Sequence, residues 1–457
     1  MSRGWVFSIN SKSIFRILTA VSLLFSACKP TLDEPKYTAG SADFSRYVAI
    51  GNSLTAGYMD NAVTREGQLH SYPALLSSRF QLVGGGTFNQ PLVNPGNGLG
   101  FDFLSFSAIG KVHLKNSINC LGQPDFSIEQ LAGNPNDLKW IGNQGPFNNM
   151  GVPGAKSFNL YSQIFGKGGA GGNPYFYRMA SDTGGAGGLS STVLGDASRI
   201  NATFFTLWIG GNDVLWNALA GGEPNGISLY DITSQPVFDA SIDTILISLT
   251  SGGAKGMVAN IPDVADIPYF NTIPYNGLVL DSLQASQLNA ISPPGIQFTE
   301  GVNAFVVSNP GGGTIRQLKA GELLLLSLPQ DSLRCGGWGT PQKPIPSTYV
   351  LDTAEIQKLQ AATLAFNSKL RNTAAAKNLA YADMFSFFRN FGKGFIYNGV
   401  TFTTQYISGG AFSLDGIHPN GRGYAIITNE FIRVINAKYG SNLPLVDVNA
   451  GTGIQFP

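Results

Sequence analysis

Short runs of apolar residues that end at glycine, asparagine or proline recur along the chain. The runs cover residues 47–50, 203–209, 257–261 and 379–382. The first stops at Gly51-Asn52-Ser53 and the second at Gly210-Gly211-Asn212. A continuous apolar run of this length, closed by turn residues, is typical of a strand buried on both faces of a parallel sheet. We therefore expect four such strands, at least two of them ending in tight turns.

Between and after these runs, apolar residues return every three or four positions, which is the spacing of one helix face. This pattern covers residues 236–250 and 425–437. A third helix is predicted from Asp352, which precedes Glu355 by three positions in a capping-box arrangement. Strand, helix and strand in this order indicate right-handed parallel crossovers. The sequence therefore predicts an α/β fold.

Two long stretches fall outside this alternation and are predicted to be insertions. Residues 60–145 are expected to be mostly loop, because turn residues interrupt them repeatedly. Residues 263–350 contain short apolar runs split by glycines between 305 and 328, which predict a small β excursion. Residues 384–413 are aromatic and irregular. With no internal repeat and no second boundary, residues 44–457 are interpreted as one elaborated domain.

The N-terminal residues read as a targeting segment. Basic residues precede a short apolar stretch at 17–25, which is too short to span a bilayer, so residues 1–27 are predicted to be a signal peptide. Ser26-Ala27-Cys28 resembles the lipobox of bacterial lipoproteins, and cleavage there would leave Cys28 carrying a lipid. The alternative is an ordinary signal peptide with Cys28 incidental. Residues 28–43 are polar and are expected to be a linker. We expect an exported, membrane-anchored protein, periplasmic or at the cell surface.

Composition narrows the range of partners. Only 12% of the residues are charged and the net charge is +1, so no basic surface is available to neutralise the phosphates of a nucleic acid. The two remaining cysteines, Cys120 and Cys335, could pair in an exported protein, although sequence alone leaves their distance open. No histidine or cysteine spacing suggests a metal site, and no cofactor is expected.

Three polar groups follow a predicted strand or precede a predicted helix and could form one reaction centre. Ser53 follows the first strand, Asn212 follows the second, and Asp415-Gly416-Ile417-His418 precedes the last helix. A serine hydroxyl becomes a nucleophile when a base removes its proton, and a carboxylate can orient that base. Of the three histidines, only His418 has an aspartate three positions before it, and His70 and His113 have no carboxylate at a comparable position, so His418 is the favoured base, with Asp415 orienting it.

Acyl transfer also needs donors for the oxyanion. Asn212 can supply an amide, and the segment Asn149-Met150-Gly151-Val152-Pro153-Gly154 can supply a backbone N–H at a probable strand end. Each of these features alone is a common turn; their order along the chain is the stronger indication.

These residues resemble the blocks of the SGNH/GDSL hydrolases, which run Ser, Gly, Asn, His in chain order. Ser53, Gly154, Asn212 and His418 with Asp415 match them, while Asn52 replaces the aspartate of the GDSL signature. The resemblance implies a flavodoxin-like α/β/α three-layer sandwich, a Ser53–His418–Asp415 triad and an oxyanion hole of Ser53, Gly154 and Asn212. It also implies hydrolysis of carboxylic esters without a metal.

The substrate stays open at this point. Lipid esters and acylated glycans both fit the resemblance, and the aromatic residues at 175–177 and 385–391 could line either kind of pocket. The alternatives to a lipase or esterase are a carbohydrate O-deacetylase and a non-catalytic surface lipoprotein that binds glycan or lipid. The oligomeric state cannot be predicted.

Overall fold

The computed structural model describes residues 4, 36–102, 107–169, 171–222 and 229–457. The chain forms two units, Met1–Tyr37 and Thr38–Pro457, and the fold below is that of the second. The expected signal peptide, the lipidation site at Cys28 and the first part of the expected linker lie outside the described residues. None of the helices in the described part of the chain has the length and apolarity that a membrane crossing requires.

A five-stranded parallel sheet forms the centre of this unit. Its strands lie in the order β7-β1-β8-β9-β16. They are β7 (Asn149–Gly151), β1 (Tyr47–Gly51), β8 (Phe204–Trp208), β9 (Lys255–Ala259) and β16 (Ala380–Ala382). Numbered along the chain, this order is 2-1-3-4-5, the flavodoxin-like order, and the α/β/α prediction is confirmed. The direction of winding reverses between β1 and β8, where such sheets bind their ligands.

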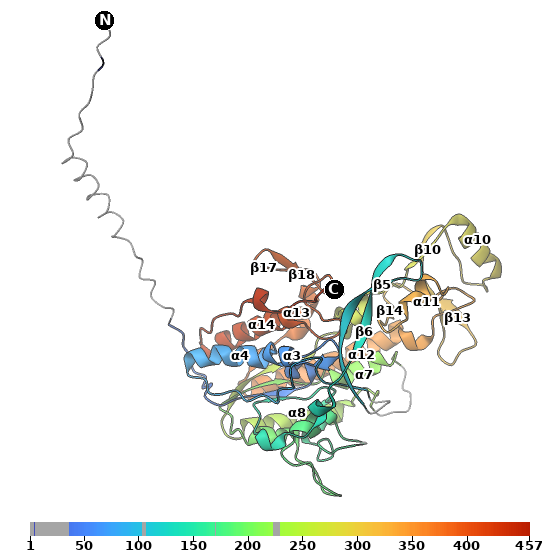
Figure 1. The fold of residues 1–457 in the computed structure, drawn as a ribbon. Helices are drawn as coiled ribbons and strands as arrows, with labels where there is room; N and C mark the ends of the chain where they lie inside the picture. The colour runs from blue at the N-terminus through green and yellow to red at the C-terminus, as the bar shows by residue number, and fades with distance from the viewer. Residues whose placement is uncertain (1–3, 5–35, 103–106, 170, 223–228) are drawn as a thin grey trace. The chain divides into compact units, whose positions relative to one another are not determined.

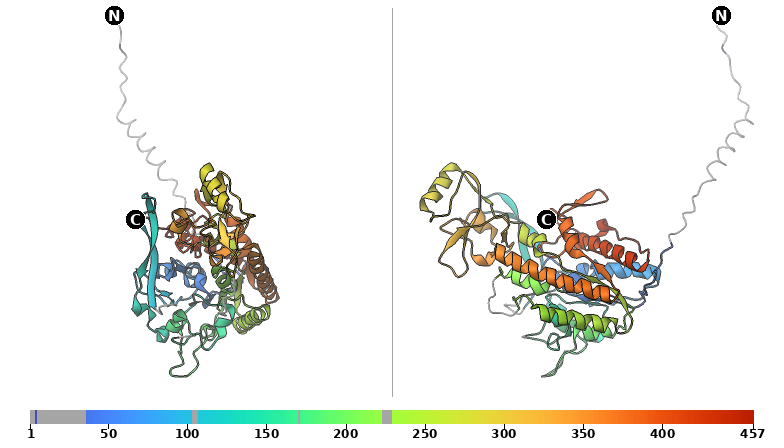
Figure 2. Two further views of the ribbon diagram at one scale, coloured as in Figure 1. Left: turned by 90° about the vertical axis from the view of Figure 1, so that its right-hand side faces the viewer. Right: turned by 180° about the vertical axis from the view of Figure 1, so that it is seen from behind.

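Helices cover both faces of the sheet (Figure 1). On one face, α8 (Gln235–Thr250) and α12 (Thr353–Ala376) run side by side, as the view from behind in Figure 2 shows, and Phe238 stacks on Phe366 with ring centroids 3.9 Å apart. On the other face, α4 (Tyr72–Phe80) packs against α14 (Gly421–Tyr439). There the ring of Tyr72 meets Phe431 at 5.0 Å. Each of these aromatic contacts joins the two helices of one outer layer to each other.

Local sequence patterns account for most of these elements. All five residues of β1 and of β8 are buried, as expected for continuous apolar strands. The capping box that begins α12 is present, with Asp352 and Glu355 each accepting the other's backbone N–H. Strand β9 begins two residues earlier than the apolar run predicted, and α14 is longer at both ends.

The prediction that residues 60–145 are mostly loop is wrong. This stretch contains α4, whose buried face joins the main core, and a three-stranded antiparallel sheet. Its strands are β4 (Gly100–Asp102), β5 (Ser107–Ile118) and β6 (Pro124–Ala132). Residues 384–413 are likewise more regular than expected, because Met384–Phe391 form helix α13.

The second insertion, 263–350, builds a satellite of short elements with a small core around Phe305, Leu324 and Ile345. The expected β excursion is present as the hairpin β12 (Val306–Ser308) and β13 (Ile315–Gln317), whereas β14 (Leu323–Leu324) pairs instead with β15 (Val350–Leu351). A disulfide between Cys120 and Cys335 joins this satellite to the β5–β6 hairpin. Beside it, Arg334 of α11 (Gln330–Arg334) forms an ion pair with Asp125.

Residues 38–43, expected to be linker, dock on the domain. Ser41 N–H donates to the carbonyl of Tyr439 at 2.8 Å, and Thr38 N–H donates to the side chain of Asn442 at 2.5 Å. The domain therefore starts before Phe44, the residue at which the sequence predicted its beginning. The remaining helices and strands are short: α2 (Ser53–Ala56), β2 (Tyr58–Met59), β3 (Ala62–Val63), α3 (Arg65–Leu69), α5 (Pro174–Met179), α6 (Val193–Ser198), α7 (Asn212–Leu219), α9 (Pro268–Asn271), β10 (Leu278–Leu280), α10 (Ser282–Ile291), β11 (Gly301–Asn303), β17 (Phe395–Tyr397) and β18 (Val400–Phe402).

Candidate active site

Ser53 lies at the carboxyl end of β1, as its sequence position predicted. Strand β1 ends at Gly51, where an added Cβ would fall 2.2 Å from Thr55 Oγ1 and 2.3 Å from the carbonyl oxygen of Trp208, so only glycine fits. Asn52 then caps α2 by accepting the N–H of Leu54 at 3.1 Å. An asparagine therefore serves this capping role without the charge of the aspartate in the GDSL signature.

His418 joins Ser53 to Asp415. Its Nε2 lies 2.8 Å from Ser53 Oγ, and its Nδ1 lies 3.0 Å from Asp415 Oδ2. The other carboxylate oxygen, Asp415 Oδ1, accepts the backbone N–H groups of Ile417 at 2.9 Å and His418 at 2.8 Å. The carboxylate is therefore fixed by its own loop, and the imidazole is held between an acceptor and a hydroxyl.

The electrostatics of Asp415 favour its ionised form. Burial acts to raise the pKa of this carboxyl, but the attraction of His418 and the hydrogen bonds from His418 and Ile417 outweigh burial, so that its pKa lies below the usual value. An ionised Asp415 can stabilise an imidazolium that forms when His418 takes a proton.

A hydrogen bond links the segments that carry two of the expected oxyanion donors, Gly154 and Asn212. Asn212 begins α7 at the end of β8 and donates one amide hydrogen from Nδ2 to the carbonyl of Ala155 at 2.9 Å. An amide nitrogen carries two hydrogens, so this bond orients the group and leaves one donor for a ligand. Gly154, the residue before Ala155, has φ +80° and lies beside Trp216 and Asn173. A glycine is needed there because other residues rarely adopt this conformation.

A small apolar cavity of about 70 Å³ lies against Ser53, Asn212 and His418. Its apolar wall comes from segments that sequence reasoning did not connect: Leu54, Leu215, Ile261, Pro262, Val264, Ile267, Phe388, Ile417 and Pro419. Of the aromatic residues singled out in the sequence, Phe388 lines this cavity. Tyr175 instead packs near Tyr58. The ring of Tyr58 contacts the imidazole of His418 at a centroid distance of 4.8 Å. In the sequence these wall residues are distinguished only by being apolar, and apolar residues alone do not indicate a pocket.

The other two histidines have hydrogen-bond partners outside the group of Ser53, Asp415 and His418. His70 Nδ1 contacts the carbonyl oxygen of Glu66 at 3.0 Å. His113 has a carboxylate partner after all, because Glu129 lies opposite it in the β5–β6 hairpin, with Nε2 and Oε2 3.0 Å apart. The sequence did not indicate this pair because His113 and Glu129 lie on two different strands, 16 positions apart along the chain. Within the described residues, no three His, Cys, Asp or Glu side chains gather in a way that could hold a metal ion.

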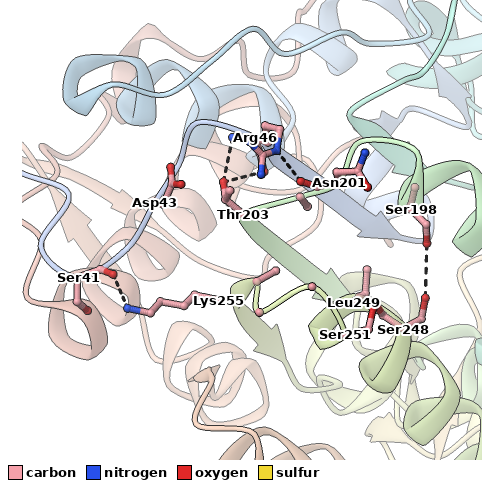
Figure 3. A pocket seen from close by; sticks show the side chains of 15 residues that line it. Ser41, Asp43, Arg46, Ser198, Asn201, Thr203, Ser248, Leu249, Ser251 and Lys255 are labelled. Atoms are coloured by element: carbon pink, nitrogen blue, oxygen red, sulfur yellow. Dashed lines mark hydrogen bonds between the residues drawn. The ribbon is translucent and has the colours of Figure 1, made fainter.

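A larger cavity, of about 500 Å³, opens at the opposite edge of the sheet, near the starts of β8 and β9 (Figure 3). Its two cations are already engaged, because Arg46 donates from Nε to the carbonyl of Asn201 at 2.6 Å and Lys255 donates to the carbonyl of Ser41. No histidine lines this cavity. Its size alone therefore does not make it the reaction centre.

Comparison with known families agrees with this geometry. The model of the GDSL-like Lipase/Acylhydrolase family matches residues 47–431, which is the greater part of the chain. The chain therefore belongs to the GDSL-like lipase/acylhydrolase family, and this membership supports ester hydrolysis as its general reaction. A search of curated proteins finds no match.

Proposed function

We propose that the protein hydrolyses carboxylic esters through a covalent acyl intermediate on Ser53. The observation that carries this proposal is the hydrogen-bonded series from Asp415 through His418 to Ser53, with 3.0 Å and 2.8 Å between the bonded atoms. Such a series activates a hydroxyl and has no evident role in stabilising the sheet.

In this mechanism Ser53 Oγ attacks the ester carbonyl while His418 Nε2 accepts its proton. The N–H groups of Ser53 and Gly154 and the amide of Asn212 stabilise the oxyanion. Collapse of the tetrahedral intermediate expels the alcohol, which takes the proton from His418. A water molecule, deprotonated by His418, then attacks the acyl-enzyme, and the second tetrahedral intermediate collapses to release the acid while His418 returns the proton to Ser53 Oγ. Asp415 orients the imidazole and stabilises its charge.

The cavity beside Ser53 supports a short acyl group. Its volume of about 70 Å³ is far below the roughly 300–1,000 Å³ of a typical ligand pocket. We take this small volume as support for a short acyl group such as acetyl. This observation favours O-deacetylation of a glycan as a second candidate over hydrolysis of long-chain lipid esters, because the alcohol can stay outside the cavity.

The direct test is the intact mass of the protein after treatment with a fluorophosphonate probe. The form that begins at Lys29, its Ser53→Ala variant and its His418→Ala variant are compared. We expect one adduct on the unmodified protein, none on Ser53→Ala and slower labelling of His418→Ala. No adduct on correctly folded protein would contradict the mechanism and favour a non-catalytic binding protein for glycan or lipid.

We also propose that the protein is exported and held at a membrane by a lipid on Cys28, on the support of the sequence alone. Cys28→Ala is expected to move the protein from the membrane fraction to the soluble fraction of expressing cells. An unchanged distribution would contradict lipidation at this residue.

A further inference from the structure

The hairpin turn between β2 and β3 lies directly against the loop that carries Asp415 and His418. Its two central residues, Asp60 and Asn61, have φ +53° and +64°, a pair of left-handed residues as in a tight hairpin turn. Three hydrogen bonds join this turn to the loop. Asp60 N–H donates to Ser413 Oγ at 3.0 Å, Leu414 N–H donates to Asp60 Oδ1 at 2.8 Å, and Asn61 N–H donates to Asp415 Oδ2 at 3.2 Å.

The last of these bonds reaches the same carboxylate oxygen that His418 Nδ1 contacts. The turn therefore acts on the orienting carboxylate itself and not only on its surroundings. The hairpin also touches the base, because the ring of Tyr58 packs on the imidazole of His418, and the Tyr58 hydroxyl donates to the carbonyl of Asn61 at 2.5 Å.

Two other elements, β5 and α14, also form hydrogen bonds with this hairpin. Val112 of β5 donates its N–H to the carbonyl of Asp60 at 2.8 Å, and Tyr424 of α14 donates its hydroxyl to the carbonyl of Tyr58 at 2.8 Å. Because these hydrogen bonds fix the hairpin, the hairpin can hold the loop of residues 413–415 in a single geometry.

We propose that Asp60 is a positioning residue of the ester hydrolase, holding the loop of Asp415 through Leu414 and adding a negative charge that favours the imidazolium of His418. This inference rests on the proposed function. Asp60 contacts no reacting atom, so it acts through Asp415 and His418. The hydrogen bond and the charge are separable, because asparagine keeps an oxygen for Leu414 N–H and loses only the charge.

Burial, helped by repulsion from Asp415, raises the pKa of Asp60 to about 6, against the effect of the Leu414 hydrogen bond. Asp60 is therefore ionised at neutral pH and loses its charge as the pH falls through about 6. The charged or titratable groups that act on it or share its surroundings are Asp415, Lys111, Glu66, Tyr406 and His113.

The experiment compares the kcat and KM for p-nitrophenyl acetate against pH for the protein and for Asp60→Asn, Asp60→Ala and Glu66→Gln. Asparagine readily adopts the left-handed conformation that position 60 requires, so Asp60→Asn should fold. Glu66→Gln is the matched control, because it removes a neighbouring carboxylate that has no hydrogen bond to the loop of residues 413–415 in the structure.

We expect Asp60→Ala to lower kcat about 10-fold with little change in KM, because Leu414 N–H loses its acceptor. Asp60→Asn should restore most of kcat at pH 8 and move the acidic limb of kcat/KM to lower pH by about 0.5 unit, since less negative charge means that His418 stays neutral to lower pH. Glu66→Gln should leave the limb in place.

Two results would overturn the proposal: unchanged profiles for both Asp60 variants, or an Asp60→Asn variant as impaired as Asp60→Ala with no movement of the limb. An inactive parent protein would instead count against the proposed function. In that case the imidazole signal of His418, followed by NMR against pH with isotope-labelled histidine, still decides the matter. The transition should move to lower pH in Asp60→Asn, and coincident curves would refute the role of Asp60.

Discussion

The imidazole Nε2 of His418 lies 2.8 Å from Ser53 Oγ, although 365 positions separate the two residues along the chain. Ser53 is held by the end of β1, and His418 by the loop that leads into α14. The contact between them therefore depends on the packing of α14 against the sheet layer that contains β1. We therefore expect Ser53 to lose its reactivity when the packing of the α/β/α core is disrupted.

Removal of the Asn212 amide should slow catalysis strongly. Asn212→Ala removes an amide whose orientation is fixed by its hydrogen bond to the carbonyl of Ala155. A single oxyanion donor typically contributes about 2.7–4 kcal/mol, or about 100- to 1,000-fold in kcat. The measurement is kcat for p-nitrophenyl acetate, with fluorescence confirming that the variant is folded. A variant with unchanged kcat would remove Asn212 from the mechanism.

The size of the cavity beside Ser53 should set the preferred acyl length. Leu215 lines this cavity and is only partly buried, so its substitution costs little stability. Leu215→Ala should raise the ratio of kcat/KM for p-nitrophenyl octanoate over acetate by about 10-fold or more, and Leu215→Phe should lower it. Equal changes for both esters in either variant would show that this cavity does not hold the acyl chain.

Asp266 should destabilise the fold at neutral pH. Its Oδ2 is buried without a hydrogen-bond partner, and burial together with Asp263 raises its pKa to about 6, partly offset by Arg389. An acid whose pKa is raised on folding binds more protons in the native state, so stability falls as the pH rises from about 4 to about 6.

Asp266→Asn should therefore increase the free energy of unfolding in urea by about 1–2 kcal/mol at pH 8, a value discounted for the 23% exposure of the side chain. The gain should be about half as large at pH 5. A gain that is equal at the two pH values would mean that the charge of Asp266 is not its cause.

The Cys120–Cys335 disulfide should stabilise the two insertions against unfolding. It links residues 215 positions apart, and loss of such a crosslink typically costs about 2–5 kcal/mol. The Cys120→Ser/Cys335→Ser double variant is expected to unfold at lower urea concentration, as is the parent protein under reduction. Because neither cysteine belongs to the main core, labelling of Ser53 should persist in the double variant before denaturant is added. An unchanged urea midpoint would contradict this prediction.

Sequence reasoning succeeded where structure is decided by neighbours along the chain. The apolar runs at 47–50 and 203–209 became fully buried strands, and the capping box at Asp352 begins a 24-residue helix. The prediction from sequence was wrong for residues 60–145, because the frequent turn residues there favoured a loop and the helix α4 was not predicted. The large apolar side chains buried by α4 are only those of Tyr72, Leu76 and Phe80, which are too few positions for a clear helical period.

By itself the sequence determined the strands, the turns that follow them, and the kinds of side chain available at each strand end, because these follow from local apolar period and turn chemistry. Only the tertiary structure decided which groups meet. It pairs His113 with Glu129, joins Cys120 to Cys335, sets Asn61 against Asp415, and builds one cavity wall from Leu54, Leu215 and Phe388. Such contacts join residues far apart in the chain, and no local pattern specifies their distance, because that distance depends on how whole elements pack.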